Sequence, residues 1–366
     1  MSYEIDFIGV KNEKAKQDAD AIAFRWLEDD IYKIVVYDGG LQAHGEELEK
    51  ILKNYYLSNG NNTIDAVIVS HSDQDHTSGL ATILENFDVK ALYMNRPWIY
   101  AEELYNKYDV DDGRMTANSL AEKLKNDYKY IKNLEDIAND KSIPIYEVFQ
   151  GTIIENRLTV LSPSKEFYLT LIAESEKTPI TENKASNIFE SFAQKVFNYV
   201  KKALEKWNIE TLKEDVSTSA ENEMSTILLG KMENESFLLV GDAGIRALNE
   251  AMDYADGIGY SLIDNVSILQ IPHHGGRHNV SPSVLNRLIG DILQEGEFIE
   301  KTAFVSAAEN SDHPLQMVVN AYIRRGVKVY KTNGNTVCHH NGEVPSRGWS
   351  SCVKEEFSTM VEEWEE

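Results

Sequence analysis

Six consecutive polar residues at the end of an apolar segment constrain the fold more than any other feature of the sequence. Residues 64–70 are rich in β-branched side chains, which is typical of a buried strand, and residues 71–76 (His-Ser-Asp-Gln-Asp-His) follow directly. A helical pattern begins near Leu80, just after Gly79. The sequence therefore predicts a turn between a core strand and a helix, and packing alone does not explain its polar side chains.

Four of these six side chains are of types that bind metal ions: His71, Asp73, Asp75 and His76. Two imidazoles with two carboxylates suit Zn²⁺, Mn²⁺ or Fe²⁺ better than Ca²⁺, which prefers oxygen ligands alone. The alternative is a polar surface loop whose aspartates cap the next helix. The density of ligand-type residues favours the metal site.

The run Ser70-His71-x-Asp73-x-Asp75-His76-x-x-Gly79 resembles the His-x-[His/Asp]-x-Asp-His signature of the metallo-β-lactamase superfamily. With Asp at the second ligand position, it is most similar to the hydrolase domain of competence (ComEC-type) DNA-uptake proteins and their soluble relatives. The resemblance implies an α/β fold, a metallo-β-lactamase-like αββα four-layer sandwich with helical insertions. We expect one such domain over residues 1–366.

Further motifs along the chain extend this resemblance. Two further polar clusters, Asp242 and His273-His274, each follow a predicted strand, and strand ends at one edge of an α/β layer converge. The motifs are Asn222-x-x-Ser225, Gly241-Asp242, Pro272-His273-His274-Gly275-Gly276 and Asp312-His313-Pro314. We therefore expect Asp242 and the two histidines to meet residues 71–76.

The resemblance also implies roles for these residues. Asp242 would bridge two divalent ions, Zn²⁺ or Mn²⁺, and a metal-bound hydroxide would be the nucleophile. One ion would be held by His71 and Asp73, and the other by Asp75, His76 and one of the paired histidines. We choose His273 as that ligand, with His274 facing the substrate. Asp75, His274 and His313 are the expected catalytic residues, His313 contacting phosphate or protonating the leaving group.

The chain departs from the family pattern between the first motif and Asp242. Most superfamily members supply a further histidine there, but no histidine occurs from residue 77 to residue 272. The first metal site therefore has few protein ligands, which favours Mn²⁺ or a single bound ion.

Asp38, before Gly39-Gly40, would support the metal loop by hydrogen bonds; the alternative is a plain turn residue.

Two stretches with helical spacing lie outside the family pattern, at about 97–142 and 167–216. In the first, one long amphipathic helix is predicted from Leu120, Leu124, Tyr128, Ile131, Leu134 and Ile137. In the second, the same spacing joins Ile188, Phe192, Val196, Tyr199, Ala203 and Trp207. These stretches could cover the active site, bind a protein partner or form a homodimer, and the sequence does not separate these possibilities.

Charge and composition limit the partners. The net charge of −24 opposes wrapping by duplex DNA but leaves a nucleotide or a short single strand possible as substrate. No apolar run is long enough for a membrane span and no signal peptide is visible, so we expect a cytoplasmic protein. The two cysteines, Cys338 and Cys352, are predicted to be free thiols, and His44, Arg324 and Arg325 to be surface residues.

Together these features predict a metal-dependent hydrolase, a phosphodiesterase or nuclease. One alternative is an ester, thioester or lactam hydrolase of the same fold. Another is a partner-dependent subunit of a multi-protein system, for example one that defends against foreign DNA.

Overall fold

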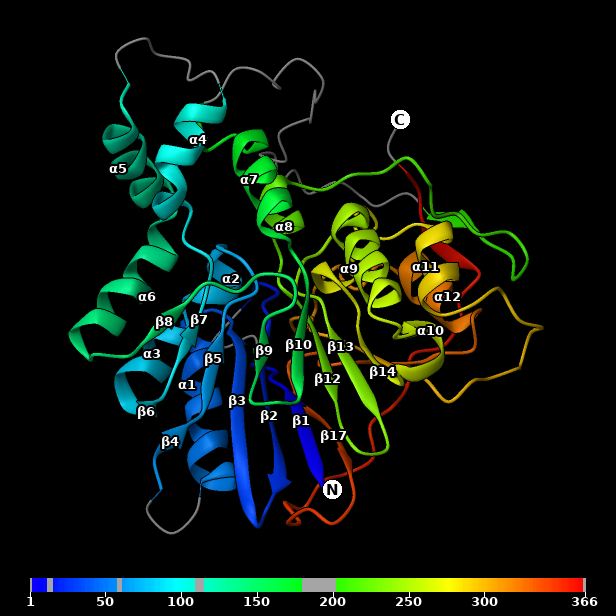
Figure 1. Ribbon diagram of the computed structural model, residues 1–366. Helices are drawn as coiled ribbons and strands as arrows, with labels where there is room; N and C mark the ends of the chain where they lie inside the picture. The colour runs from blue at the N-terminus through cyan, green and yellow to red at the C-terminus, as the bar shows by residue number, and fades with distance from the viewer. Residues whose placement is uncertain (1, 12–15, 58–60, 109–114, 180–201, 365–366) are drawn as a thin grey trace.

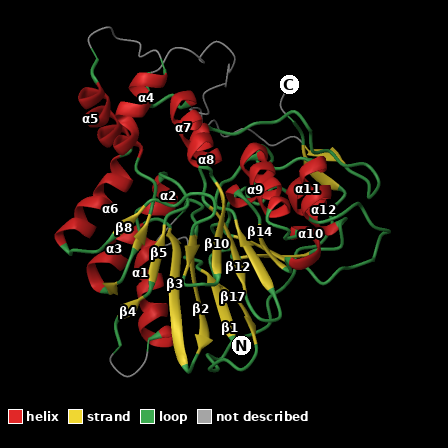
Figure 2. Ribbon diagram, viewed as in Figure 1, coloured by secondary structure: helices red, strands yellow, loops and turns green. Residues whose placement is uncertain are grey.

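Two seven-stranded β-sheets lie face to face, and helices cover their outer sides (Figures 1 and 2). The computed structural model describes residues 2–11, 16–57, 61–108, 115–179 and 202–364. These four layers confirm the predicted α/β class and the αββα arrangement.

The first sheet has the strand order β17-β1-β2-β3-β5-β7-β8. Strands β1 to β3 run antiparallel, whereas β5, β7 and β8 continue the sheet in parallel from β3. The β2–β3 turn consists of Asp29 and Asp30, both with positive φ (49° and 63°), as a tight two-residue hairpin requires. The strands are β1 (Tyr3–Phe7), β2 (Ala21–Glu28), β3 (Ile31–Gly39), β5 (Ala66–Ile68), β7 (Leu92–Tyr93), β8 (Ile145–Tyr146) and β17 (Val337–Asn341).

The second sheet has the order β16-β15-β14-β13-β12-β10-β9. Strands β13, β14, β15 and β16 are parallel, so their carboxyl ends lie at one edge of the sheet. Asp242 follows β13 and His273 follows β14, and both therefore leave the sheet at this edge. The strands are β9 (Ile153–Ile154), β10 (Leu158–Ser162), β12 (Ile227–Lys231), β13 (Ser236–Leu239), β14 (Ile268–Gln270), β15 (Thr302–Val305) and β16 (Lys328–Lys331).

Three apolar clusters hold the four layers together. The cluster between the sheets is rich in aromatic side chains, with Phe7 stacked on Phe304 (ring centres 4.9 Å apart) and Phe24 edge-on to Phe237 (5.0 Å). A second cluster joins the first sheet to α1 (Gln42–Ile51), α3 (Leu80–Asn86) and α6 (Lys129–Asp140). A third joins the second sheet to α9 (Ile245–Gly257), α11 (Pro282–Leu288) and α12 (Gln316–Ile323).

Shorter elements connect these layers. The helices and helical turns are η1 (Leu52–Tyr56), α2 (Gln74–Thr77), η2 (Pro97–Tyr100), α4 (Ala101–Lys107), α5 (Ala117–Asp127), α7 (Lys165–Glu174), α8 (Ala220–Glu223), α10 (Leu262–Asn265) and η3 (His273–Gly275). Two small sheets pair β4 (Thr63–Ile64) with β6 (Asp88–Val89), and β11 (Lys202–Leu204) with β18 (Met360–Glu362).

The helical stretches differ from the sequence-based prediction. The single long helix predicted from Leu120 to Ile137 is wrong, because α5 and α6 are separate and the chain bends at Tyr128 (φ −100°, ψ 44°). The Tyr128 ring is buried there and its hydroxyl donates to Ser175 Oγ (3.2 Å).

The second stretch also departs from the prediction. Ala203 lies in strand β11 rather than in a helix, because β11 pairs with β18 near the C-terminus. Four members of the predicted stripe, Ile188, Phe192, Val196 and Tyr199, lie outside the described residues.

Three residues predicted at the surface are buried instead. Arg324 and Arg325 are 0% and 1% exposed and pair with Glu205 (3.1 Å) and Glu210 (2.8 Å), which explains how the charges are tolerated. His44 in α1 is 3% exposed. Burial lowers the pKa of His44 to about 4, so its ring is neutral near pH 7.

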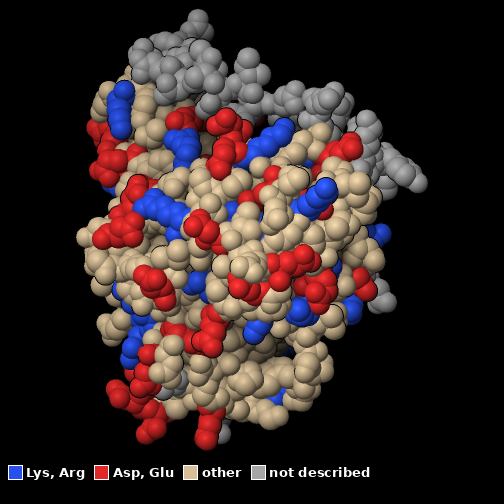
Figure 3. Space-filling view, turned by 90° about the vertical axis from the view of Figure 1, so that its right-hand side faces the viewer, with Lys and Arg blue, Asp and Glu red and all other residues tan. Residues whose placement is uncertain are grey.

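The surface charges, the helix lengths and the two cysteines can be compared with what the sequence predicts. On the face shown in Figure 3, acidic and basic side chains are interspersed. Within the described ranges, none of the helices is both long and apolar enough to span a bilayer. Cys338 and Cys352 are both free thiols, as predicted.

Candidate metal centre

The loop after β5 is held in place by a buried aspartate from the neighbouring strand. Asp38, at the end of β3, has a φ of 57° and is fully buried. Its carboxylate accepts hydrogen bonds from the Ser70 backbone N–H (2.7 Å), the Ser70 hydroxyl (2.5 Å) and His76 Nδ1 (2.9 Å). Asp38 thus fixes both the start of the loop and the ring of His76.

Four buried side chains from distant parts of the chain meet beside this loop. They are Asp20, His76, Asp242 and His274, and one ligand-type atom from each lies within 4.8 Å of the others. Asp20 precedes β2, His76 lies in α2, Asp242 follows β13 and His274 lies in η3. Both sheets therefore contribute to the group.

Hydrogen bonds at the outer ring nitrogens aim the two imidazoles into the group. His76 Nδ1 donates to Asp38, and His274 Nδ1 donates to the backbone carbonyl of Ser306 (3.0 Å). In a neutral ring whose Nδ1 donates, Nε2 is the nitrogen left to bind a metal ion, the arrangement of a metal-binding histidine. Against the effect of burial, neighbouring carboxylates raise the pKa of both His76 and His274, so a metal ion at Nε2 would displace a proton.

Several atoms of this group have no hydrogen-bond partner among the described residues. They are Nε2 of His76 and His274, Oδ1 of Asp242 and both carboxylate oxygens of Asp20. His76 Nε2 lies 3.2 Å from Asp242 Oδ1, so one cation could contact both atoms. Because buried polar atoms are almost always satisfied, this donor set fits a divalent cation, which would satisfy them together.

The charges of the group depend on its carboxylates. Burial alone would raise the pKa of Asp242, but His76, His273 and His71 hold that pKa well below the ordinary value. Burial raises the pKa of Asp20, although His274 and His76 oppose the shift. Asp242 is thus the more acidic of the two carboxylates, and a bound cation would favour the ionised form of both.

The second oxygen of Asp242 faces a different pair of histidines. Asp242 Oδ2 lies 3.6 Å from His273 Nε2 and 3.8 Å from His71 Nε2. His273 Nδ1 donates to Asn279 Oδ1 (2.8 Å), and His71 Nδ1 lies 3.0 Å from Ser70 Oγ. One carboxylate therefore separates two sides of the site, the Oδ1 side and the Oδ2 side.

The adjacent histidines reach opposite sides of Asp242 because of their backbone. His273 and His274 have φ values of 49° and 55°, a left-handed conformation that is unfavourable for residues with a Cβ. Gly275 follows with φ 86°, and a Cβ there would lie 2.4 Å from the Cβ of Pro314. A glycine is thus needed where this turn meets the loop that carries His313.

Comparison with known proteins agrees with the fold. Residues 33–131, which include the 71–76 motif, match the family model described as the metallo-beta-lactamase superfamily. The chain has the metallo-β-lactamase fold. The comparison with curated proteins gave no match.

Solved structures similar to this chain include a diphosphatase from the PhnP family, at 11% identity and TM-score 0.40 over 93% of this chain and 98% of that chain. YhfI from Bacillus subtilis, described as a metallo-β-lactamase fold protein, has 8% identity and TM-score 0.42 over 93% and 100%. MEM-A1, a subclass B3 metallo-β-lactamase from a soil metagenome, has 10% identity and TM-score 0.32 over 78% and 83%. Similarity at this level carries no argument about function.

Within this metallo-β-lactamase fold, five of the predicted site residues lie at the centre, on one or the other side of Asp242 or as Asp242 itself. His76, Asp242 and His274 belong to the four-residue group, and His71 and His273 lie on the Oδ2 side of Asp242. The geometry of the group favours His274 over His273 as its ligand, the opposite of the choice made from the sequence.

The other three predicted residues lie around this centre. Asp75 Oδ2 is 3.6 Å from His274 Nε2, and Asp73 Oδ2 is 3.8 Å from His71 Nε2. His313 Nδ1 pairs with Asp18 Oδ2 (3.0 Å), and neither residue is part of the four-residue group.

Three residues near the centre were not singled out from the sequence. Asp18 and Asp20 come from the segment before β2, where the Asp20 N–H donates to the Asp75 carbonyl (3.1 Å). Two aspartates at alternate positions before a strand were a usable signal. The third, Lys177, lies 3.3 Å from Asp73 Oδ1 through its Nζ, and no local pattern marks it.

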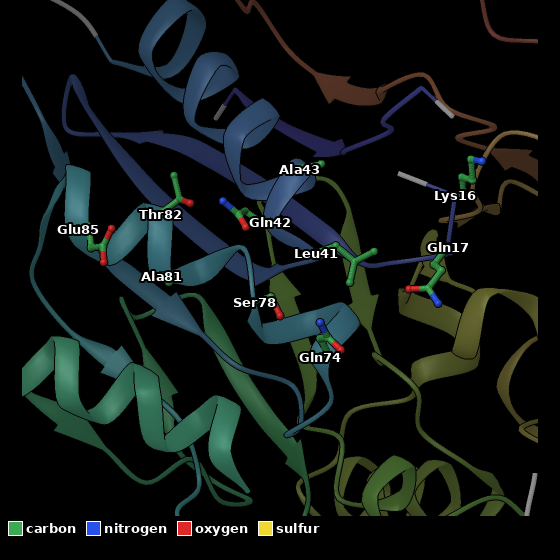
Figure 4. A pocket seen from close by; sticks show the side chains of 10 residues that line it. All are labelled: Lys16, Gln17, Leu41, Gln42, Ala43, Gln74, Ser78, Ala81, Thr82 and Glu85. Carbon is green, nitrogen blue, oxygen red and sulfur yellow. The ribbon is translucent and has the colours of Figure 1, made fainter. Parts of the chain in front are cut away.

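A hollow of about 820 Å³ adjoins the loop of residues 71–76 (Figure 4). Its lining includes the uncharged polar side chains of Gln17, Gln42, Gln74, Ser78 and Thr82. Gln74 precedes Asp75, but none of the four grouped residues lines the hollow. It therefore neighbours the centre without being part of it.

Proposed function

We propose that this protein is a metal-dependent hydrolase that cleaves phosphodiester bonds, with Asp20, His76, Asp242 and His274 holding a divalent ion, Zn²⁺ or Mn²⁺. The observation that carries the proposal is the convergence of four buried ligand atoms within 4.8 Å. When bound, the ion would lower the pKa of a water molecule and stabilise negative charge on the substrate.

The protein groups around the ion would orient its ligands and move protons. Asp38 and the Ser306 carbonyl direct the two inner imidazoles, while Asp75 contacts His274. His273 has a side chain that is 37% exposed, and its Nε2 lies 3.6 Å from Asp242 Oδ2. On this proposal His273 exchanges a proton with substrate or water.

The predicted roles of the outer residues form part of the same proposal. His313 would contact the substrate, since its side chain is 34% exposed and is oriented by Asp18. His71 and Asp73 line the Oδ2 side of Asp242 and would face the substrate or a second cation.

Two observations support a phosphodiester as the substrate. The motif with Asp73 at the second ligand position is similar to that of competence-type hydrolases. Lys177 places a cation at the partly exposed side of the site, where it suits an anionic substrate. The net charge of −24 opposes long duplexes, so we propose small nucleotides or short single strands.

Turnover of two chromogenic substrates tests the proposal. The purified protein, supplied with Mn²⁺ or Zn²⁺, should hydrolyse bis(4-nitrophenyl) phosphate and not the lactam nitrocefin. Asp242→Asn should abolish this turnover, whereas Asp253→Asn, at an exposed position of α9, should not. Lactam hydrolysis without phosphodiester hydrolysis would favour the lactamase alternative, and full activity of Asp242→Asn would disprove the site.

A further inference from the structure

The two sides of Asp242 have different sources of positive charge. On the Oδ1 side, the unpaired atoms of four residues require a cation that the chain does not supply. On the Oδ2 side, a lysine already contacts the outermost carboxylate, Asp73. We propose that the ammonium of Lys177 takes the place of a second metal ion, so that each chain binds one divalent ion. This inference rests on the proposed function.

Lys177 is held by contacts on several sides. Its Nζ lies 3.3 Å from Asp73 Oδ1, 3.6 Å from Glu221 Oε1 and 5.1 Å from the centre of the Tyr128 ring. The Glu221 carboxylate is itself fixed, because it accepts a hydrogen bond from Ser175 Oγ (2.5 Å). The ammonium is therefore positioned by the fold, unlike a surface lysine that samples many rotamers.

Charge neutralisation at Asp73 explains why one ion suffices. Two carboxylates could join a second ion beside His71, because Oδ2 of Asp73 and Oδ2 of Asp242 each lie 3.8 Å from His71 Nε2. Asp242 would be shared with the first ion, so Asp73 is the carboxylate that only the second ion would use. Its other oxygen already forms an ion pair with Lys177. A divalent ion on the same carboxylate would be repelled by the ammonium, and at a half-buried position water screens this repulsion only in part.

The grouping of ligand atoms agrees with this assignment. Among the described residues, the candidate metal group contains Asp20, His76, Asp242 and His274 but neither His71 nor Asp73. Asp73 has a side chain that is 36% exposed, whereas Asp20 and Asp242 are 1% and 3% exposed. On the Oδ2 side His71 Nε2 is also buried and lacks a hydrogen-bond partner among the described residues, but the Asp73 carboxylate beside it is partly exposed and pairs with a lysine.

Counting bound ions tests the inference without relying on activity. The purified proteins would be saturated with Mn²⁺, freed of excess metal and measured by elemental mass spectrometry. Wild type and Lys177→Arg should contain one ion per chain, and Lys177→Met should contain two. Adding Asp73→Asn to Lys177→Met should return the count to one.

Lys165 offers a matched control for the lysine substitution. It pairs with Glu103 (2.8 Å) and lies 5.1 Å from the ring centre of Tyr100, so its contacts imitate those of Lys177. It has no contact with the metal centre among the described residues, and Lys165→Met should contain one ion per chain.

The possible counts separate this inference from the proposed function. Two ions in wild type would overturn the inference and leave the hydrolase proposal standing. One ion in both wild type and folded Lys177→Met would also overturn it, because the ammonium would not be what excludes a second ion. No bound ion in wild type would overturn the proposed function itself. If Lys177→Met fails to fold, Lys177→Gln replaces it, with two ions expected and a count of one overturning the inference.

Discussion

The Oδ1 and Oδ2 sides of Asp242 differ in burial and in how their polar atoms are satisfied. On the Oδ1 side, His76 and His274 are 0% and 4% exposed, and their inward nitrogens lack partners among the described residues. On the Oδ2 side, His273 and Asp73 are more than a third exposed, and Asp73 pairs with Lys177. His71 is the exception on that side, since its ring is buried and its Nε2 also lacks a hydrogen-bond partner among the described residues. Burial without partners indicates a metal site, whereas exposure with an ion pair indicates a place for substrate and water.

The sharpest test of this contrast is the removal of an imidazole from the buried side. His274→Ala should lose the bound ion and reduce phosphodiester turnover by roughly a thousandfold, since a metal ion contributes several kcal/mol to the transition state. Elemental mass spectrometry and the bis(4-nitrophenyl) phosphate assay measure the two effects. His340→Ala, at an exposed strand position, serves as the control. A His274→Ala protein that retains its ion would remove the distinction between the two sides.

Removal of the neighbouring imidazole should have a smaller effect of a different kind. His273→Ala should keep one ion per chain, because His273 lies outside the four-residue group. Turnover should fall about a hundredfold, the usual cost of losing a proton-transfer group. The same two measurements apply. If His273→Ala loses the ion and His274→Ala keeps it, the original choice of His273 as ligand was right.

A substitution at a residue that orients a ligand on the buried side should weaken binding of the ion without removing the ligand itself. Asp38→Asn replaces a carboxylate that accepts from His76 Nδ1 (2.9 Å), so His76 loses part of its orientation. We expect Mn²⁺ affinity to fall about tenfold to a hundredfold, as for other residues that orient metal-binding histidines. Titration calorimetry measures this affinity, with Asp253→Asn as the matched control. Unchanged affinity would show that the ring of His76 does not depend on Asp38.

The residues that could be predicted share a local signature. Residues 71–76, Asp242 and the paired histidines each follow an apolar strand, and consecutive residues are enough to reveal such a strand. That parallel strands end at one edge then predicts that these side chains approach one another. The αββα layers were implied by the family resemblance of the motifs, and the alternation of strands and helices agrees with the α/β class.

The residues that could not be predicted depend on contacts between distant segments. Asp20 joins the group because the segment before β2 hydrogen-bonds to Asp75, and Lys177 reaches Asp73 across more than one hundred positions of the chain. Arg324 and Arg325 could be buried only because Glu205 and Glu210 lie beside them. The two aspartates before β2 were a local signal for a polar site, but the sequence does not show which distant residue any of these side chains contacts.

The sequence by itself determined where polar side chains follow the strands, because a strand is recognised from a run of adjacent apolar and β-branched residues. The tertiary structure alone decided which side chains share a cation and which face water. His273 and His274 make the distinction clear: they are chemically identical neighbours. Their left-handed backbone turns one toward Asp242 Oδ2 and the other toward the carboxylates of Asp20 and Asp75.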